Sequence, residues 1–139
     1  SATNVTLAGG GMLYGSAEKD WNWFSKVDNR MSPDAADGSN GRINLLLITK
    51  STGVLVRDLH FHNSTDWSFR MDSSENIHVD NVDIYGDSRF PNNDGFDPES
   101  CINVTLVNSR ISVADDGICP KASLSGGPLR GLYVVTSSD

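Results

Sequence analysis

Apolar and polar residues alternate in short segments that recur along the chain, as at Val54 and Val56 or at Ile77 and Val79. An apolar residue at every second position predicts β-strands that bury one face. The first apolar positions of the recurring segments follow one another after 23, 27 and 28 residues. These segments span residues 51–61, 74–84, 101–111 and 129–136, and residues 1–7 form a weaker fifth copy. The chain therefore repeats one unit built from strands.

Each repeat contains further strand signals. A polar turn residue follows the first strand, at Asp58, Asn81 and Asn108, and a second short apolar alternation comes after it. A third strand is predicted at residues 68–71, 95–98 and 117–120. Three short strands in each repeat of about 25 residues predict an all-β fold, a right-handed parallel β-helix that gains about 4.8 Å in height per coil. We expect a single domain over residues 1–139, with residues 15–41 forming a loop carried on the solenoid.

Composition narrows the class of protein. The chain has 139 residues, which is the size of one domain, and a formal net charge of −7, which disfavours binding to nucleic acid. The longest apolar stretch, residues 43–48, is interrupted by Asn44 and is too short to cross a membrane. Because the chain opens directly on a strand pattern without a leading Met, we expect it to be a processed or excised part of a longer protein.

Three aspartates carry the candidate chemistry. Asp94 aligns with Asp116 one coil later, so their backbones should lie about 5 Å apart, and Asp115 stands beside them. Carboxylates this close raise at least one pKa, which leaves a protonated acid next to ionised bases, as glycoside hydrolysis requires. Two simpler interpretations remain open: Asp-Gly is a common turn dipeptide, and clustered carboxylates also bind Ca²⁺.

These motifs resemble those of the polygalacturonases and their relatives, family 28 of the glycoside hydrolases. The family carries Asn-Thr-Asp-Gly, then Gly-Asp-Asp about one coil later, an Asn-Ser-x-x-Trp element, and an earlier glycine turn followed by tryptophans. The corresponding segments here are 92–95, 114–116, 63–67 and 11–15 with Trp21 and Trp23. The sequence of residues 94–100 resembles the exo-acting branch of the family more than the endo-acting branch.

The resemblance implies an inverting hydrolase acting on pectin-like polysaccharide that contains galacturonic acid. By the family pattern, Asp115 is the general acid, and Asp94 and Asp116 activate water, with no cofactor and no metal ion. Lys121 matches a lysine that follows the aspartate pair, and we expect it, together with Asn92, to contact the substrate without acting as the carboxylate clamp.

The chain also departs from the family pattern. Asn93 replaces the usual threonine and Ala114 the usual glycine, both changes that the site should tolerate. The family's Gly-His-Gly and Arg-x-Lys elements, which orient the acid and clamp the uronate carboxylate, have no counterpart here. We therefore expect residues 1–139 alone to be inactive on polygalacturonate and to associate through the open end of the solenoid.

Sequons at Asn4, Asn63 and Asn103 predict glycosylation and, with only two cysteines, a secreted protein. Whether Cys101 and Cys119 form a disulfide stays open, because Cys119 should stack over Asp97 rather than over Cys101.

Two further groups have modest claims to a function. His60 and His62 alternate on one strand face and could chelate a metal ion, although a solvated outer face is the simpler interpretation. Trp21 and Trp23 could stack on sugar rings or pack the loop onto the solenoid.

Two other functions compete with hydrolysis. A non-catalytic β-solenoid could bind polysaccharide or serve as an extracellular scaffold, and the absent histidine and clamp elements favour this alternative. A polyanion lyase is a third and weaker alternative, since lyases with this solenoid fold rely on Ca²⁺ and a basic residue. The retention of all three aspartates favours the hydrolase.

Overall fold

A computed structural model describes residues 1–17, 44–122 and 127–135 of the chain. Ten strands make up the described part, and it contains no helix long and apolar enough to cross a membrane. The strands are β1 (Thr3–Ala8), β2 (Met12–Tyr14), β3 (Leu46–Thr49), β4 (Thr52–His62), β5 (Phe69–Asp72), β6 (Glu75–Tyr85), β7 (Phe96–Glu99), β8 (Ile102–Val107), β9 (Arg110–Ser112) and β10 (Arg130–Val135).

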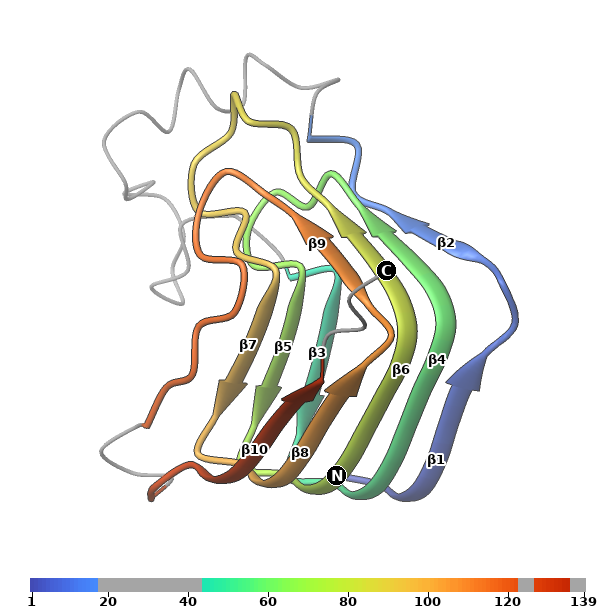
Figure 1. The fold of residues 1–139 in the computed structure, drawn as a ribbon, viewed down its shortest axis with the longest axis vertical. Coiled ribbons are helices and arrows are strands. Elements are labelled where there is room, and N and C mark those ends of the chain that lie inside the picture. Colours follow the sequence, from blue (N-terminus) through green and yellow to red (C-terminus); the bar gives the residue numbers. More distant parts are fainter. Residues whose placement is uncertain (18–43, 123–126, 136–139) are drawn as a thin grey trace.

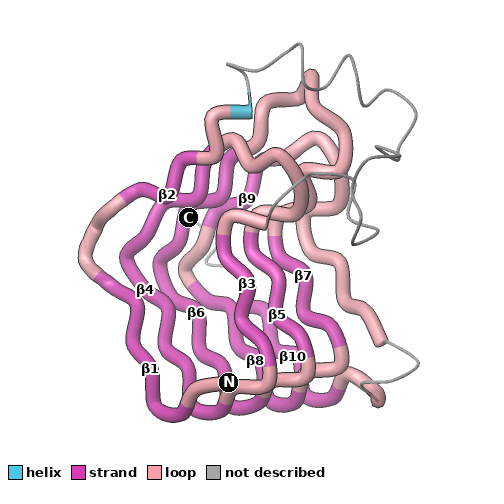
Figure 2. Tube along the Cα trace, turned by 180° about the vertical axis from the view of Figure 1, so that it is seen from behind, coloured by secondary structure: helices cyan, strands magenta, loops and turns pink. Residues whose placement is uncertain are grey.

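The strands stack into two parallel sheets that wrap around a common core (Figure 1, Figure 2). The larger sheet has the order β1-β4-β6-β8-β10, with β2 paired to β4 and β9 paired to β6, and the smaller sheet has the order β3-β5-β7. Every pairing is parallel and joins strands of successive repeats. The predicted parallel β-helix is therefore confirmed, with about three turns in the described part.

The register of the large sheet follows the repeat alignment made from the sequence. Val5 pairs with Val54, Val54 with Ile77, Ile77 with Val104, and Val104 with Leu132. The weak copy at the start of the chain is thus a true coil, formed by β1. These first apolar positions align because each apolar side chain must pack in the same core layer as its counterpart in the next coil.

The corners of the coils use residues that tolerate a left-handed backbone. Asp58, Asn81 and Asn108 have φ values of 56°, 51° and 50°, as expected for Asx turns. The sequence predicts a break between two strands here, but β4 and β6 run through the corner as long bent strands (Figure 1). Among the described coils, the first splits into β1 and β2, and the coil of residues 101–111 splits into β8 and β9. One residue in the left-handed region bends a strand without ending its pairing to the next coil.

The core is a stack of apolar side chains in successive coils. Phe61 and Phe69 lie stacked with ring centroids 5.4 Å apart, and Phe69 meets Phe96 edge to face at 5.4 Å. All three side chains are fully buried. Since alternate residues of β5 and β7 fill this core, the residues between them point outward from the small sheet, where a site can form.

Two predictions for other segments have different outcomes. Most of the predicted loop, residues 18–41, and with it Trp21 and Trp23, lies outside the described residues. The third strand predicted at residues 117–120 is reduced to two isolated bridges, which pair Ile118 with Phe96 and Lys121 with Glu99. The Cys119 and Lys121 N–H groups still donate to the carbonyls of Phe96 and Pro98, but Pro98 has no N–H group to donate back to this segment, which interrupts the ladder.

Candidate active site

The segments 94–97 and 116–121 lie on neighbouring coils beside the small sheet. The backbone N–H of Gly95 donates to the carbonyl of Asp116 at 2.9 Å, and the N–H of Ser68 donates to the carbonyl of Asp94 at 2.7 Å. Asp94 and Asp116 therefore occupy equivalent places on successive coils. Their carboxylate oxygens and the Cys119 Sγ lie within 4.8 Å of one another.

Asp94 is the buried member of this group. Its side chain lies 3.6 Å from the Lys121 Nζ through Oδ2, while Oδ1 has no hydrogen-bond partner in the structure. Burial raises the pKa of Asp94, the charge of Lys121 opposes that rise, and the neighbouring Asp115 and Asp116 add to it. The raised pKa expected from crowded carboxylates is present here, but burial is its largest cause.

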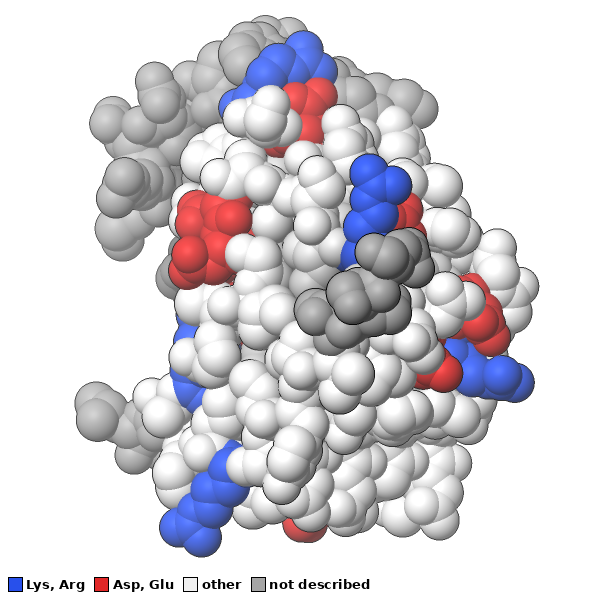
Figure 3. Space-filling model, viewed as in Figure 1, with Lys and Arg blue, Asp and Glu red and all other residues white. Residues whose placement is uncertain are grey.

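Asp115 and Asp116 are exposed, on the turn that follows β9. Figure 3 shows an acidic patch over this turn. The Asp115 carboxylate accepts hydrogen bonds from two backbone N–H groups, that of Asp116 to Oδ1 at 3.0 Å and that of Asn92 to Oδ2 at 3.2 Å. The second bond ties the turn to the coil of Asp94. Asp115 is thus fixed in direction while it stays open to solvent.

Asn93 locks the two coils together from inside. Its fully buried side chain donates from Nδ2 to the carbonyl of Asp87 at 3.0 Å and accepts at Oδ1 from the Ala114 N–H at 2.8 Å. A Cβ at Gly86 would lie 2.4 Å from the Asn93 Nδ2, so glycine is required there. The family pattern predicts only that Asn93 is a tolerated replacement, whereas the structure gives it a positioning role between the aspartate turns.

Lys121 connects a second buried carboxylate to the site. Its Nζ forms an ion pair with Asp97 Oδ1, and Asp97 is fully buried with Oδ2 lacking a hydrogen-bond partner. Burial raises the pKa of Asp97 to about 7, and Lys121 only partly offsets that rise. Burial lowers the pKa of Lys121, but the Asp97 carboxylate outweighs it and the net change is upward, so the ammonium stays charged.

An aromatic ring completes this part of the site. The Lys121 Nζ lies 3.9 Å from the centroid of the Trp67 ring, and the Arg70 Cζ lies 4.9 Å from the same ring. Arg70 in turn donates from Nη2 to Glu99 Oε2 at 2.7 Å. Trp67 thus packs against two cations, each of which is also held by a carboxylate.

Sequence reasoning missed Asp97 and the packing of Trp67. A usable signal was present, because Asp97 is a charged residue inside a four-residue strand next to the core residue Phe96. A charge at such a position needs a partner on the neighbouring coil. On the neighbouring coil, Cys119 is in register with Asp97, and Lys121, two residues further on, is that partner.

The donor set of Asp94, Asp116 and Cys119 does not suit the Ca²⁺ ion considered from the sequence. Calcium takes six to eight oxygen ligands, whereas this cluster includes a thiol. The ammonium of Lys121, 3.6 Å from the Asp94 carboxylate, already supplies a positive charge at that point. A set of two carboxylates and a thiol beside an ammonium therefore does not fit this ion.

The sequons lie in three different settings. Asn4 is exposed at the first coil. Asn103 is exposed and donates from Nδ2 to Asn76 Oδ1 at 3.1 Å, within a column of corner residues. Asn63 is half-buried, and its Oδ1 accepts from the Asp87 N–H at 3.2 Å, so it has a structural part in the turn.

Both cysteines are free thiols. Cys101 is buried in the core, and Cys119 is half-buried at the site. The register places Cys119 beside Asp97, as the sequence predicted, and the Cys101 Sγ instead donates to the carbonyl of Glu99 at 3.3 Å.

Comparison with known proteins gives the same family as the motifs. The chain matches Glycosyl hydrolases family 28 over residues 1–125, a range that includes all three candidate aspartates. It is 26% identical over 137 residues to a probable exopolygalacturonase B of Aspergillus fumigatus, covering 94% of this chain and 29% of that protein. It is 30% identical over 78 residues to a probable polygalacturonase of Vitis vinifera, covering 56% of this chain and 16% of that protein.

A solved structure supports the fold. A Parabacteroides merdae protein assigned as a glycosyl hydrolase aligns with a TM-score of 0.70 at 12% sequence identity, over 97% of this chain and 57% of that protein. The chain spans less than a third of the length of the curated relatives described above. With a family match that covers nearly the whole sequence and a solenoid of the expected register, the chain belongs to family 28 of the glycosyl hydrolases.

Proposed function

We propose that the protein hydrolyses α-linked galacturonic acid units in pectin-like polysaccharide, as a polygalacturonase-like glycosidase. Membership of family 28 supports this function, as do the names of the matched plant and fungal relatives. The observation that carries the proposal is the meeting of three aspartates from two coils beside the small sheet. Asp94 and Asp116 stack there, and Asp115 is held beside them by two backbone N–H groups.

Each aspartate has a distinct role in the proposed reaction. Asp115, exposed and fixed in direction, donates a proton to the glycosidic oxygen as that bond breaks. Asp94 and Asp116 together take a proton from a water molecule, which attacks the anomeric carbon from the opposite side and inverts its configuration. Asp94 and Asp116 then release the proton taken from water to solvent, and Asp115 regains a proton from solvent, so atoms and charge balance over the cycle.

Lys121 supports this assignment through charge. A base must be ionised when water is activated, yet burial favours the neutral form of Asp94. The ammonium 3.6 Å away opposes that effect. Lys121 is therefore an electrostatic positioning residue in the proposal, and together with Asn92 it is the proposed contact to the polar groups of the substrate.

We further propose a secreted glycoprotein whose partner is an acidic polysaccharide. The sequons at Asn4 and Asn103 support this, since both asparagines are exposed. Asn63 is the least favourable acceptor, because its side chain is engaged in the turn.

Asp115→Asn in the full-length protein tests the function. We expect the rate on polygalacturonate to fall by about 10²–10⁴-fold, the usual contribution of a general acid. Asp58→Asn, at a corner residue with φ 56°, is the matched control and should keep the wild-type rate. A near wild-type rate for Asp115→Asn would remove this residue from the acid role. Full-length protein that binds polygalacturonate without releasing reducing ends would instead support the non-catalytic alternative.

The stereochemistry of the first product tests the roles of Asp94 and Asp116. Proton NMR of the initially formed sugar should show inverted configuration if both residues act on a water molecule. A retained configuration would mean that one of these carboxylates attacks the sugar directly as a nucleophile.

A further inference from the structure

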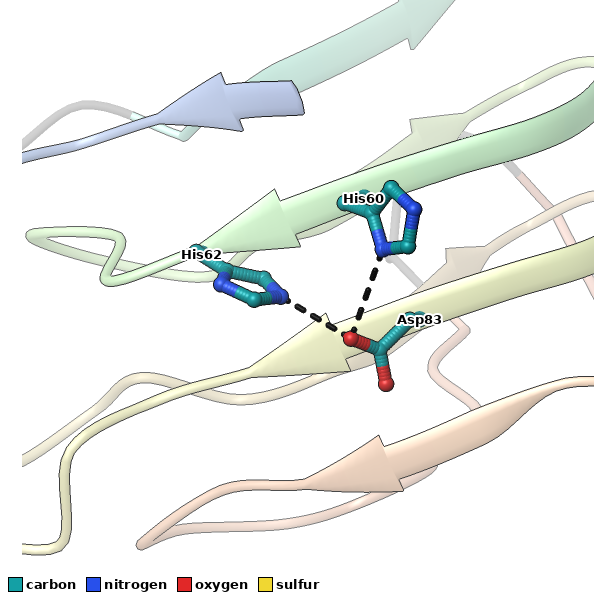
Figure 4. Close-up of side chains that lie close together, drawn as sticks. All are labelled: His60, His62 and Asp83. Carbon is teal, nitrogen blue, oxygen red and sulfur yellow. Dashed lines mark hydrogen bonds and ion pairs between the residues drawn. The ribbon is translucent and has the colours of Figure 1, made fainter. Parts of the chain in front are cut away.

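Two histidines and an aspartate converge on the outward face of the large sheet, on strands that do not contribute to the candidate active site. Figure 4 shows His60 and His62 on β4 and Asp83 on β6, with both imidazoles directed at one carboxylate oxygen. The His62 Nε2 lies 2.9 Å from Asp83 Oδ2, and the His60 Nδ1 lies 3.5 Å from the same oxygen. All three ligand atoms lie within 4.8 Å of one another.

The solenoid register builds this arrangement. Residues two apart on a strand point to the same face, which brings His60 and His62 together. Asp83 is the direct register partner of His60 on the next coil. The three side chains are 46%, 23% and 32% exposed, so an ion from solvent can reach them while the paired strands hold their backbones.

From this geometry we infer that His60, His62 and Asp83 form a binding site for a divalent transition metal ion of the Zn²⁺ type. Tetrahedral Zn²⁺ with bonds of about 2.0–2.1 Å places its ligand atoms roughly 3.3 Å apart. The distances from the two imidazole nitrogens to Asp83 Oδ2, 2.9 and 3.5 Å, lie on either side of that value. Two imidazoles and one carboxylate are a donor set that suits Zn²⁺ and not Ca²⁺ or Mg²⁺, which prefer oxygen ligands.

Two tyrosines and an arginine flank the cluster. Tyr85 lies beside His62 with ring centroids 5.6 Å apart, and Tyr14 is the register partner of His62 on the other side. Arg110 is the register partner of Asp83 on β9, and its charge opposes a bound cation. A bound ion would link β4 to β6, and so join two coils of the solenoid on strands that do not contribute to the candidate active site.

The test is titration of the full-length protein with Zn²⁺ alone, followed by isothermal calorimetry. Wild-type protein should bind Zn²⁺ at a site that His60→Ala, His62→Ala and Asp83→Asn each weaken at least tenfold. His78→Ala is the matched control, since His78 is an exposed histidine on β6 away from this cluster, and it should change the dissociation constant less than twofold. Ca²⁺ should not compete for the site.

A spectroscopic measurement guards against variants that fail to fold. Co²⁺ bound to wild-type protein should give the visible absorption of a tetrahedral site, and folded His62→Gln should lose it. The inference is overturned if Zn²⁺ binding is unchanged in the His60 and His62 variants, or if His78→Ala weakens it equally. It is also overturned if Cys119→Ser alone abolishes binding, because the ion would then sit at the Asp94 and Asp116 cluster.

Discussion

Asp97 and Asp83 place the same kind of interaction in two different regions of the solenoid. Each carboxylate contacts a basic side chain on a neighbouring coil, Lys121 in one case and His60 with His62 in the other. Asp97 is fully buried, whereas Asp83 is 32% exposed.

The pKa values of the two carboxylates move in opposite directions. Burial raises the pKa of Asp97 to about 7 in spite of Lys121. Burial also acts to raise the pKa of Asp83, but the hydrogen bonds from His62 and His60 outweigh it and the net change is downward. The depth of the carboxylate, more than the presence of a basic partner, decides which protonation state the fold favours. One fold can therefore hold a buried carboxylate with a raised pKa and an exposed carboxylate with a lowered pKa, 14 residues apart in the sequence.

The largest change should come from removing the basic partner on the buried side. Lys121→Met leaves the Asp97 and Asp94 carboxylates without their cation, and we expect a loss of about 3 kcal/mol in the free energy of unfolding at pH 8. Urea denaturation measures it. Arg57→Met, at an exposed ion pair with Asp58, is the control and should change stability little. Equal losses in both variants would contradict the comparison.

Asn93→Ala should cause the second largest loss in the free energy of unfolding. It removes a buried amide that satisfies the Asp87 carbonyl and the Ala114 N–H, so we expect a loss of about 2 kcal/mol. The rate on polygalacturonate should also fall, since the turns of Asp94 and Asp115 would no longer be held together. Asn44→Ala, which removes a longer 3.4 Å bond to Asp66, should cost less than Asn93→Ala by the same denaturation assay. A reversed order would show that Asn93 does not lock the two coils.

The pH dependence of the free energy of unfolding tests the raised pKa of Asp97 directly. In the folded protein Asp97 keeps its proton up to about pH 7, whereas in the unfolded chain it ionises near pH 4. The folded state therefore holds more protons between these values, and the free energy of unfolding should fall as pH rises from 5 to 7. The slope can reach at most about 1.4 kcal/mol per pH unit. Asp97→Asn should lack this slope, and parallel curves for the two proteins would contradict the assignment.

The smallest effect is expected at the exposed face. Asp83→Asn, measured without added metal at pH 7, should cost less than about 1 kcal/mol, as is usual for exposed ion pairs. Because the pKa of Asp83 is lowered, its contribution is present above the unfolded value near 4 and disappears as pH falls below it. A loss as large as that of Lys121→Met would show that the outer cluster is part of the structural core.

Much of the fold could be predicted because a solenoid repeats its information. The same core layer is filled in each coil by the first apolar residue of the repeat, namely Val54, Ile77, Val104 and Leu132. The alignment of the repeats therefore already predicted the strand register. What the pattern could not show was that β4 and β6 continue through Asp58 and Asn81. A single residue with positive φ looks the same in sequence whether it bends a strand or ends it.

The candidate site was predictable to the level of which residues share a coil position. A 22-residue step placed Asp94 beside Asp116, and the Gly95 hydrogen bond to Asp116 agrees with that placement. The sequence did not show that Asp94 is buried while Asp115 is exposed, because both belong to similar acidic turns. It also did not show that Asn93 joins the two turns through its side chain.

By itself, then, the sequence determined the period of the solenoid, the alignment of its coils and the grouping of the three aspartates, since these depend on spacing along the chain. Only the tertiary structure decided that Asp97 meets Lys121 under Trp67, and that His60 and His62 share one oxygen of Asp83. Burial and side-chain direction depend on the neighbouring coils as much as on the residue. The protonation state of each carboxylate follows from that depth, and so it emerges only when the coils are stacked.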